Sequence, residues 1–405
     1  MTKVAPSPNQ PAPWTIALAG ALSLAVAMGI GRFAFTPMLP LMIGEGQIDI
    51  AAAGWVAAAN YAGYLAGAVS APRLRWSALR LGMVALVLTV LLTAAMALPV
   101  SAWIWGALRF VAGVCSAWAF IATAVWCLGA LARIGKPAWS SFVYTGVGLG
   151  IAGAGLYCLA GASLSAPARS LWLQLGALAA VLVLPVMLVL SRMGAAAPVA
   201  ATLPKVGQAP SSRNTGLVIC YGMLGFGYIL PATFLPVLAR SVVEDPRLFG
   251  LAWPVFGVTA ALSVVVGAWL LIRVSRLKIW AASNVLMALG VLLPSVWLNG
   301  WTIALSALLV GGTFMVVTLA GVQEIRARTT GDPTAAVSRM TAAFAIGQIA
   351  GPVFSSLLLH LPGFRETGLT LALQAAALSL VVCAAWLWRE AHRMSLAVQE
   401  KPHAR

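Results

Sequence analysis

Twelve long apolar segments alternate with short polar gaps along the chain. They lie at about residues 14–42, 51–71, 79–98, 101–131, 139–163, 168–191, 214–239, 248–272, 279–298, 301–323, 337–360 and 367–388. A helix of about 20 apolar residues spans a bilayer, and it satisfies its own backbone hydrogen bonds there. The pattern therefore predicts an all-α integral membrane protein with twelve transmembrane helices.

The longest gap between these segments, residues 193–213, is rich in Ala, Pro, Ser and Gly, which is the composition of a linker. It divides the predicted helices into six and six. We therefore predict five parts: a tail at 1–13, an N-terminal six-helix bundle at 14–192, a linker at 193–213, a C-terminal six-helix bundle at 214–389 and a tail at 390–405.

A weak internal repeat relates the two halves. Gly29–Pro40 matches Gly225–Pro236 at an offset near 196, and Ile151–Gly153 matches Ile349–Gly351 at an offset of 198. Parallel six-helix repeats with a substrate site near the midplane between them recur among secondary transporters. The repeat therefore favours two pseudo-symmetric bundles.

The composition excludes an ordinary soluble protein. Hydrophobic residues make up 61% of the chain and charged residues only 8%, whereas a soluble domain has about 25% charged residues. The net charge is +16, but the Lys and Arg residues are scattered through the gaps and form no basic patch. We therefore expect this basic chain to interact with the lipid bilayer and not with nucleic acid.

The basic residues also predict the topology. Nineteen Lys and Arg residues lie in the tails and the even-numbered gaps, against four in the odd-numbered gaps. Because basic residues favour the cytoplasmic side, we predict that both termini and the 193–213 linker are cytoplasmic.

Two cations lie inside predicted spans, Arg32 in the first and Arg109 in the fourth. Both are expected to lie about 12 to 15 Å below the outer surface of the membrane. A charge inside a span costs about 2.5–3.5 kcal/mol on insertion scales, which makes each a candidate functional residue. All nine acidic residues lie in gaps, tails or at segment ends. The arginine pair therefore favours binding of an anionic substrate. The alternative is that each arginine braces a helix pair by binding backbone carbonyls.

The lack of a mid-span acid also bears on proton coupling. The usual proton carrier is missing, so a coupled proton would travel on the substrate's own carboxyl group or through Glu324 at the end of the tenth segment. Uniport and exchange are equally open.

Five uncharged residues complete the predicted substrate site. Asn60, Tyr61 and Tyr64 lie on one face of the second segment, at the depth of the arginines. Tyr228 is too deep for an interfacial anchor, and Gln348 lies mid-span, where helix–helix hydrogen bonding is the alternative role.

No motif indicates a metal, a cofactor or an enzyme. The chain has no CxxC, HExxH or Walker motif, and its three His residues lie at or beyond segment ends. We therefore predict no catalytic residues, no metal ligands and no cofactor.

Several local signatures are similar to those of a known family. They are Gly29–Met42, Gly54-Trp55, Asn60–Gly67, Arg109–Gly113, Gly225–Pro236 and Gly347–Pro352. With twelve helices in two halves, the chain resembles the YbfB/YjiJ branch of the major facilitator superfamily. The resemblance implies a bacterial inner-membrane protein that works by alternating access, with the first and fourth helices beside a central cavity.

One position departs from that family. The loop after the second helix usually has an acidic residue four positions after a Gly, but Ala71 stands there, and the equivalent loop at residues 273–278 also has no acid. We therefore do not predict the usual form of the charged contacts that the family has on its inward side.

These observations together predict a monomeric secondary active transporter for a small organic solute, with an anion favoured as the substrate. Two other function classes stay open. A membrane-embedded enzyme would need His or acid clusters inside the membrane, and a non-transporting receptor or scaffold would not need two deep arginines.

The predicted topology can be tested by cysteine labelling. In a cysteine-free background, a single cysteine in the 193–213 linker and another next to Gly46 should react from opposite sides of the membrane, because we place the linker inside and Gly46 outside. Reaction of both positions with a membrane-impermeant reagent added from the periplasm would contradict the topology.

Overall fold

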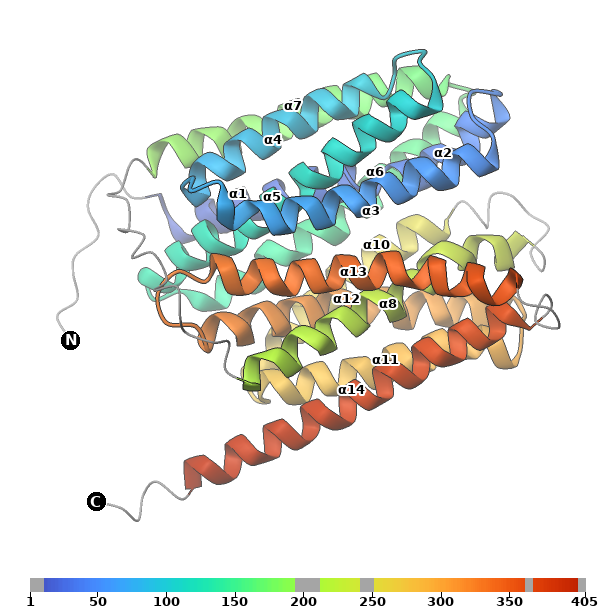
Figure 1. Ribbon diagram of the computed structural model, residues 1–405. Helices are drawn as coiled ribbons and strands as arrows, with labels where there is room; N and C mark the ends of the chain where they lie inside the picture. The colour runs from blue at the N-terminus through green and yellow to red at the C-terminus, as the bar shows by residue number, and fades with distance from the viewer. Residues whose placement is uncertain (1–10, 194–211, 241–250, 361–366, 400–405) are drawn as a thin grey trace. The chain divides into compact units, whose positions relative to one another are not determined.

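The computed structural model describes residues 11–193, 212–240, 251–360 and 367–399, and all regular structure within these ranges is helical. The helices are α1 (Pro13–Leu24), η1 (Ala25–Ile30), α2 (Phe35–Gly44), α3 (Ile50–Ser70), η2 (Ala71–Arg73), α4 (Ala78–Ala95), α5 (Ala102–Arg133), η3 (Pro137–Trp139), α6 (Ser140–Ser163), α7 (Ala168–Arg192), α8 (Ser212–Arg240), α10 (Ala252–Leu271), α11 (Arg276–Val296), α12 (Gly300–Ala327), α13 (Thr334–His360) and α14 (Gly368–Gln399) (Figure 1). The predicted all-α class is confirmed.

Ten helical segments in the described part of the chain are long and apolar enough to cross a membrane. Helices α3 and α13 are not among them. These two helices contain Asn60, Tyr61, Tyr64 and Gln348, four of the seven predicted site residues. Ten of the twelve predicted spans therefore have a matching apolar helix among the described residues, and the spans at α3 and α13 stay predictions.

Short side chains cap the helices and define where the loops end. Asp49 accepts a hydrogen bond from the Ala52 amide at 2.7 Å at the start of α3, and Ser275 accepts one from the Lys278 amide at the start of α11. Asn299 and Thr302 form a capping box at the start of α12. Such caps satisfy amides that the first helical turn leaves without partners, so a chain of tightly spaced helices can turn within a few residues.

Packing divides the chain into two compact units. Unit 1 is Met1–Ala209 with Thr330–Ser338, and unit 2 is Pro210–Thr329 with Arg339–Arg405. The boundary falls within the predicted 193–213 linker, of which residues 194–211 lie outside the described residues, as do residues 1–10 of the predicted N-terminal tail.

In unit 1, α3 packs along α5, and α6 packs along α1 and η1. Glycines permit both contacts. A Cβ atom added at Gly113 would lie 2.2 Å from the carbonyl oxygen of Asn60, and one at Gly150 would lie 2.5 Å from the carbonyl oxygen of Ala25. Close backbone approach of this kind replaces the hydrophobic effect as a packing force between helices in lipid.

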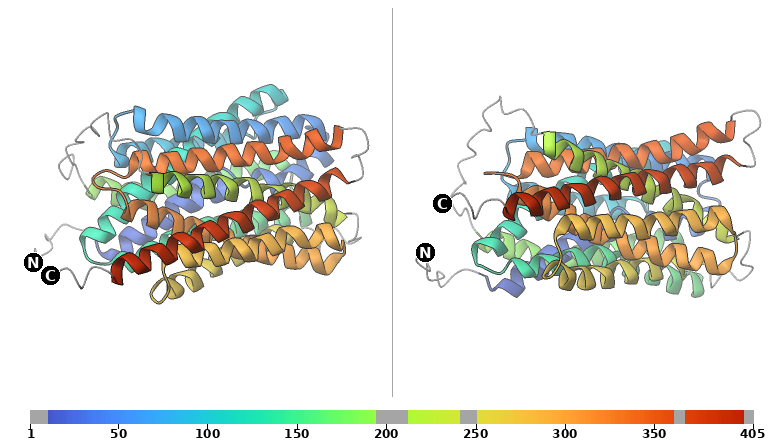
Figure 2. Two further views of the ribbon diagram at one scale, coloured as in Figure 1. Left: turned by 60° about the horizontal axis from the view of Figure 1, so that its bottom comes forward. Right: turned by 90° about the horizontal axis from the view of Figure 1, so that it is seen from below.

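In unit 2, α11 packs against both α12 and α14, and α8 packs against α14 and α12. Helix α14 has 32 residues, and its C-terminal part extends beyond the start of α11 (Figures 1 and 2). The predicted boundary between bundle and tail at residues 389 and 390 therefore lies inside a helix. The reason is local, because buried Glu390 forms an ion pair with Arg328 of unit 2.

The glycine contact between α3 and α5 gives a stability prediction. Gly113→Ala should destabilise the folded chain by about 1–3 kcal/mol, because the added methyl group overlaps the α3 backbone. The matched control is Gly153→Ala, since a Cβ at Gly153 meets no atom within 4 Å. The control should be neutral or stabilising by up to about 1 kcal/mol, since Ala has the higher helix propensity. Thermal unfolding in detergent measures both, and equal midpoints for the two variants would contradict the packing argument.

Candidate functional site

The first membrane-spanning segment is broken near its middle. Between α1 and α2 lie the π-helical turn η1 and a four-residue turn at 31–34. The π-type bonds run from the Gly31 amide to the Val26 carbonyl at 2.8 Å and from the Phe33 amide to the Met28 carbonyl at 3.0 Å. The Thr36 amide then bonds to the Phe33 carbonyl, at 3.2 Å, instead of continuing an α-helical ladder to the carbonyl of Arg32. Carbonyl groups in this turn therefore need donors from elsewhere.

Arg109 of α5 supplies those donors. Its Nη1 donates to the Gly31 carbonyl and its Nη2 to the Arg32 carbonyl, each at 2.6 Å, and its side chain is buried. The planar fork of a guanidinium suits two neighbouring acceptors. These contacts match the alternative role from the sequence analysis, in which the arginine braces a helix pair by binding backbone carbonyls. We therefore treat Arg109 as a positioning residue, and its predicted contact with substrate stays without support from the geometry.

Asn60 of α3 fixes α5 in turn. Its Nδ2 donates to the carbonyl oxygen of Arg109 at 2.9 Å, and its side chain is buried, while its Oδ1 makes no hydrogen bond within the described part of the chain. Asn60 therefore joins α3 to the residue that braces the broken segment.

Arg32 lies within the broken turn, and aromatic rings from two elements surround its guanidinium. Its Cζ lies 3.7 Å from the ring centre of Tyr64, 5.9 Å from that of Tyr61 and 5.4 Å from that of Phe33. Arg32 and Tyr64 are buried, and Tyr61 is half-buried. Aromatic faces attract a cation without neutralising its charge. The guanidinium is thus held in a defined place and keeps its full charge.

The carboxylates of unit 1 lie at helix ends. Glu45 accepts hydrogen bonds from Gln47 and from the Ala168 amide, Asp49 caps α3, and Asp332 accepts from Thr334. Unit 1 contains no further Asp or Glu. Its two mid-span charges, Arg32 and Arg109, are therefore both positive.

Tyr228 and Gln348 contact each other in unit 2. Gln348 Nε2 donates to Tyr228 Oη at 3.2 Å, and both side chains are buried. The Tyr228 ring stacks between Phe314 and Phe344, with ring centres 5.4 and 5.7 Å away. In the sequence repeat, Tyr228 occupies the position of Arg32. The structure therefore brings five predicted site residues together in unit 1 and the other two together in unit 2.

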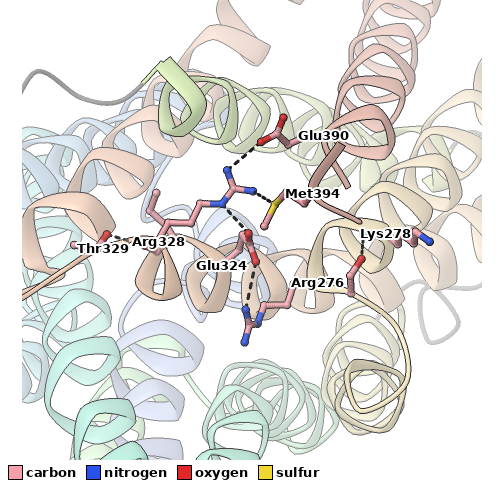
Figure 3. Close-up of polar contacts among 9 residues, drawn as sticks. Arg276, Lys278, Glu324, Arg328, Thr329, Glu390 and Met394 are labelled. Carbon is pink, nitrogen blue, oxygen red and sulfur yellow. Dashed lines mark hydrogen bonds and ion pairs between the residues drawn. The ribbon is translucent and has the colours of Figure 1, made fainter. Parts of the chain in front are cut away.

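Sequence reasoning missed a charged cluster in unit 2. Glu324 accepts from Arg328 Nε at 2.7 Å and from Arg276 Nη1 at 3.4 Å, while Arg328 Nη1 also contacts Glu390 at 3.3 Å (Figure 3). The loop before α11 has no acid of its own, and α12 and α14 supply the acids instead. The spacing of four residues between Glu324 and Arg328 on one helix was the available signal.

Comparison with known proteins relates the chain to a family and to solved structures. A family model described as "Uncharacterised MFS-type transporter YbfB" matches residues 24–387. The crystal structure of the human organic anion transporter MFSD10 (TETRAN) is similar to this chain with a TM-score of 0.67 at 15% sequence identity, covering 93% of this chain and 100% of the other. At that identity the likeness concerns the fold alone. Comparison with curated protein sequences gives no significant match.

The bracing role of Arg109 can be tested in the absence of any substrate. Arg109→Met should destabilise the chain by about 3 kcal/mol or more, because two charge-assisted hydrogen bonds to buried carbonyls are lost. Arg109→Lys should lie between this variant and the parent, because a single ammonium cannot reproduce the fork. Arg169→Met is the control, since Arg169 is exposed on α7. Thermal unfolding without ligand is the measurement, and a midpoint of Arg109→Met equal to that of the control would refute the brace.

Proposed function

The chain belongs to the family of YbfB-type transporters of the major facilitator superfamily, and from this premise we propose that it is a secondary active transporter for a small organic anion. It works as a monomer by alternating access in a bacterial inner membrane, with both termini in the cytoplasm.

One observation supports the anion most strongly, namely the buried guanidinium of Arg32 over the ring of Tyr64. A charge inside a span is costly, and the cation–π contacts of Arg32 compensate part of its lost hydration. A carboxylate matches the guanidinium fork with two parallel hydrogen bonds. A substrate with such a group would supply the negative charge that unit 1 lacks at this depth.

The neighbouring residues receive roles that follow from their contacts. Arg109 holds the carbonyl of Arg32 itself, so it positions the binding residue. Tyr61 and Tyr64 provide the aromatic surface beside the cation, and Asn60 has a buried Oδ1 that can accept a hydrogen bond from a substrate hydroxyl or amine. In unit 2, the Tyr228–Gln348 pair offers a neutral polar contact flanked by phenyl rings.

Glu324 has a structural role in this proposal. Arg276 and Arg328 hold it in ion pairs, and Arg328 links it to Glu390 of α14. A proton that accompanies the substrate would therefore travel on the substrate's own carboxyl group. The solved structure of similar fold is that of an organic anion transporter, which supports the proposed substrate class.

A ligand-stabilisation screen of the purified chain tests the proposal. The screen compares carboxylates, amino acids, sugars and cationic drugs, and we expect a carboxylate to raise the unfolding temperature. Uptake of that compound into proteoliposomes then distinguishes a transporter from a receptor or scaffold that only binds. Chemical conversion of the compound, detected by mass spectrometry, would instead indicate a membrane-embedded enzyme.

Variants of Arg32 test the binding role directly. Arg32→Ala should weaken binding of the identified carboxylate by about ten- to hundredfold, the range for a hydrogen bond to a charged group. Arg32→Lys should weaken it less, because the charge remains while the fork is lost. Arg169→Ala, at an exposed position, should bind like the parent. Folded Arg32 variants that transport the substrate like the parent, or a substrate that is cationic at neutral pH, would refute the anion site.

A further inference from the structure

Unit 2 contains a cavity of about 660 Å³ at the end of the bundle where α10 stops and α11 starts. It is lined by Leu271, residues 273–278, Glu324 of α12 and three residues of α14, Ala391, Met394 and Ser395. All of these residues belong to unit 2, so the cavity is separate from the Arg32 site of unit 1. Its lining combines apolar residues, such as Leu271 and Met394, with basic ones.

Three cations line this cavity: Arg273, Arg276 and Lys278. Glu324 is the acid in the lining, and it is already shared by Arg276 and Arg328, while Glu390 is held by Arg328 (Figure 3). Four cations thus stand against two carboxylates in the whole region, a net charge of plus two. Within the described part of unit 2, no carboxylate lies within ion-pair distance of Arg273 or Lys278. The cavity is therefore complementary to an anion.

Tryptophans place these cations at the level of lipid headgroups. The Arg273 Cζ lies 4.2 Å from the ring centre of Trp269, and the Lys278 Nζ lies 5.8 Å from that of Trp388. Both rings are about half exposed, at 52% and 54%, and neighbouring Ile272 is 79% exposed. Half-exposed tryptophan is typical of the membrane–water interface. A ligand here would therefore meet cations at one end and exposed apolar surface at the other.

The start of α11 reinforces the same preference. This helix has 21 residues and begins at Arg276, with Ser275 as its cap, so its amide-rich end faces the region of the three cations. Amides at a helix start favour anions, and phosphate is the anion most often held in this way. Helix geometry and side-chain charge therefore favour the same ligand chemistry.

We propose that this cavity binds the phosphate of an anionic phospholipid, with the acyl chains against the exposed surface of α10 beside Trp269 and Ile272. Basic pockets at the ends of transmembrane helices recognise such headgroups. Free phosphate shares the headgroup's chemistry but would leave the apolar side uncovered. A headgroup phosphate there would share Arg276 with Glu324, so the lipid would contact the ion-pair cluster that joins α11, α12 and α14.

Native mass spectrometry of the purified full-length chain tests this proposal. The chain is mixed with phosphatidylglycerol or with phosphatidylcholine, and the retained lipid is counted. The parent should retain phosphatidylglycerol in preference to phosphatidylcholine. Replacing Arg273→Gln and Lys278→Gln together should lower phosphatidylglycerol affinity by about fivefold for each cation removed. The charge-preserving pair Arg273→Lys and Lys278→Arg should retain the lipid.

The chain offers a matched control in Arg80, which is at offset 198 from Lys278 and also lies over a tryptophan, with its Cζ 4.9 Å from the ring centre of Trp76. Arg80→Gln should retain phosphatidylglycerol like the parent. Equal loss in Arg80→Gln would show general surface attraction and would overturn the proposal. Equal retention of the two lipids by the parent would also overturn it. So would equal retention of phosphatidylglycerol by the Gln double variant and by the parent.

A final arm separates lipid from free phosphate. Inorganic phosphate added in phosphatidylcholine should not reproduce the stabilisation that phosphatidylglycerol gives in thermal unfolding. If it did, and the Gln double variant abolished the effect, the ligand would be free phosphate and the lipid assignment would be wrong. Should the double variant be unstable in phosphatidylcholine, Arg273→Gln alone replaces it, and parent-like retention of phosphatidylglycerol by that variant would overturn the proposal.

Discussion

Unit 1 depends on satisfying the carbonyl groups that the break in its first span leaves without helical partners. In a bilayer no water reaches such groups, and each unsatisfied one costs several kcal/mol. Arg109 meets two of them at 2.6 Å. Asn60 then binds the backbone of Arg109, and the contact at Gly113 lets α3 approach α5 closely enough for that bond. The position of Arg32 follows from this chain of contacts, because its own carbonyl is one of the two acceptors.

Comparing the two repeats indicates why unit 1 has Arg109 as a brace. The first helix of unit 2, α8, runs unbroken from Ser212 to Arg240. At the offset of 198, the counterpart of Arg109 is Ala307, which is buried. Apart from the carbonyls four residues before Pro231 and Pro236, which have no amide hydrogen to donate, this continuous helix can satisfy its own carbonyls, so it has less need of an arginine. The broken span and its arginine therefore occur together, and unit 2 places the stacked ring of Tyr228 where unit 1 places the cation Arg32.

The sequence predicted the helices and the polar residues that are buried among them, because a long apolar segment and a polar residue inside it can be seen without knowing how the helices pack. It left open whether Arg109 binds substrate or braces a helix pair, because the answer depends on the π-helical turn η1, which was not predicted from the sequence. The sequence also missed the ion pairs of Arg276 with Glu324 and of Arg328 with Glu390, since the two members of each pair lie far apart along the chain and meet through the packing of α11, α12 and α14. Hydrophobic periodicity says where a helix is, but it does not say which helix faces which.

Helices α3 and α13 each place a polar amide of the predicted site inside a bundle. They contain the buried amides of Asn60 and Gln348, and each amide bonds to a partner on a neighbouring helix. Because a lone helix would expose these amides to lipid, α3 depends on α5, and α13 depends on α8, for the polar groups to be satisfied. The residues that make the site chemically competent therefore also require the bundles in which it is built.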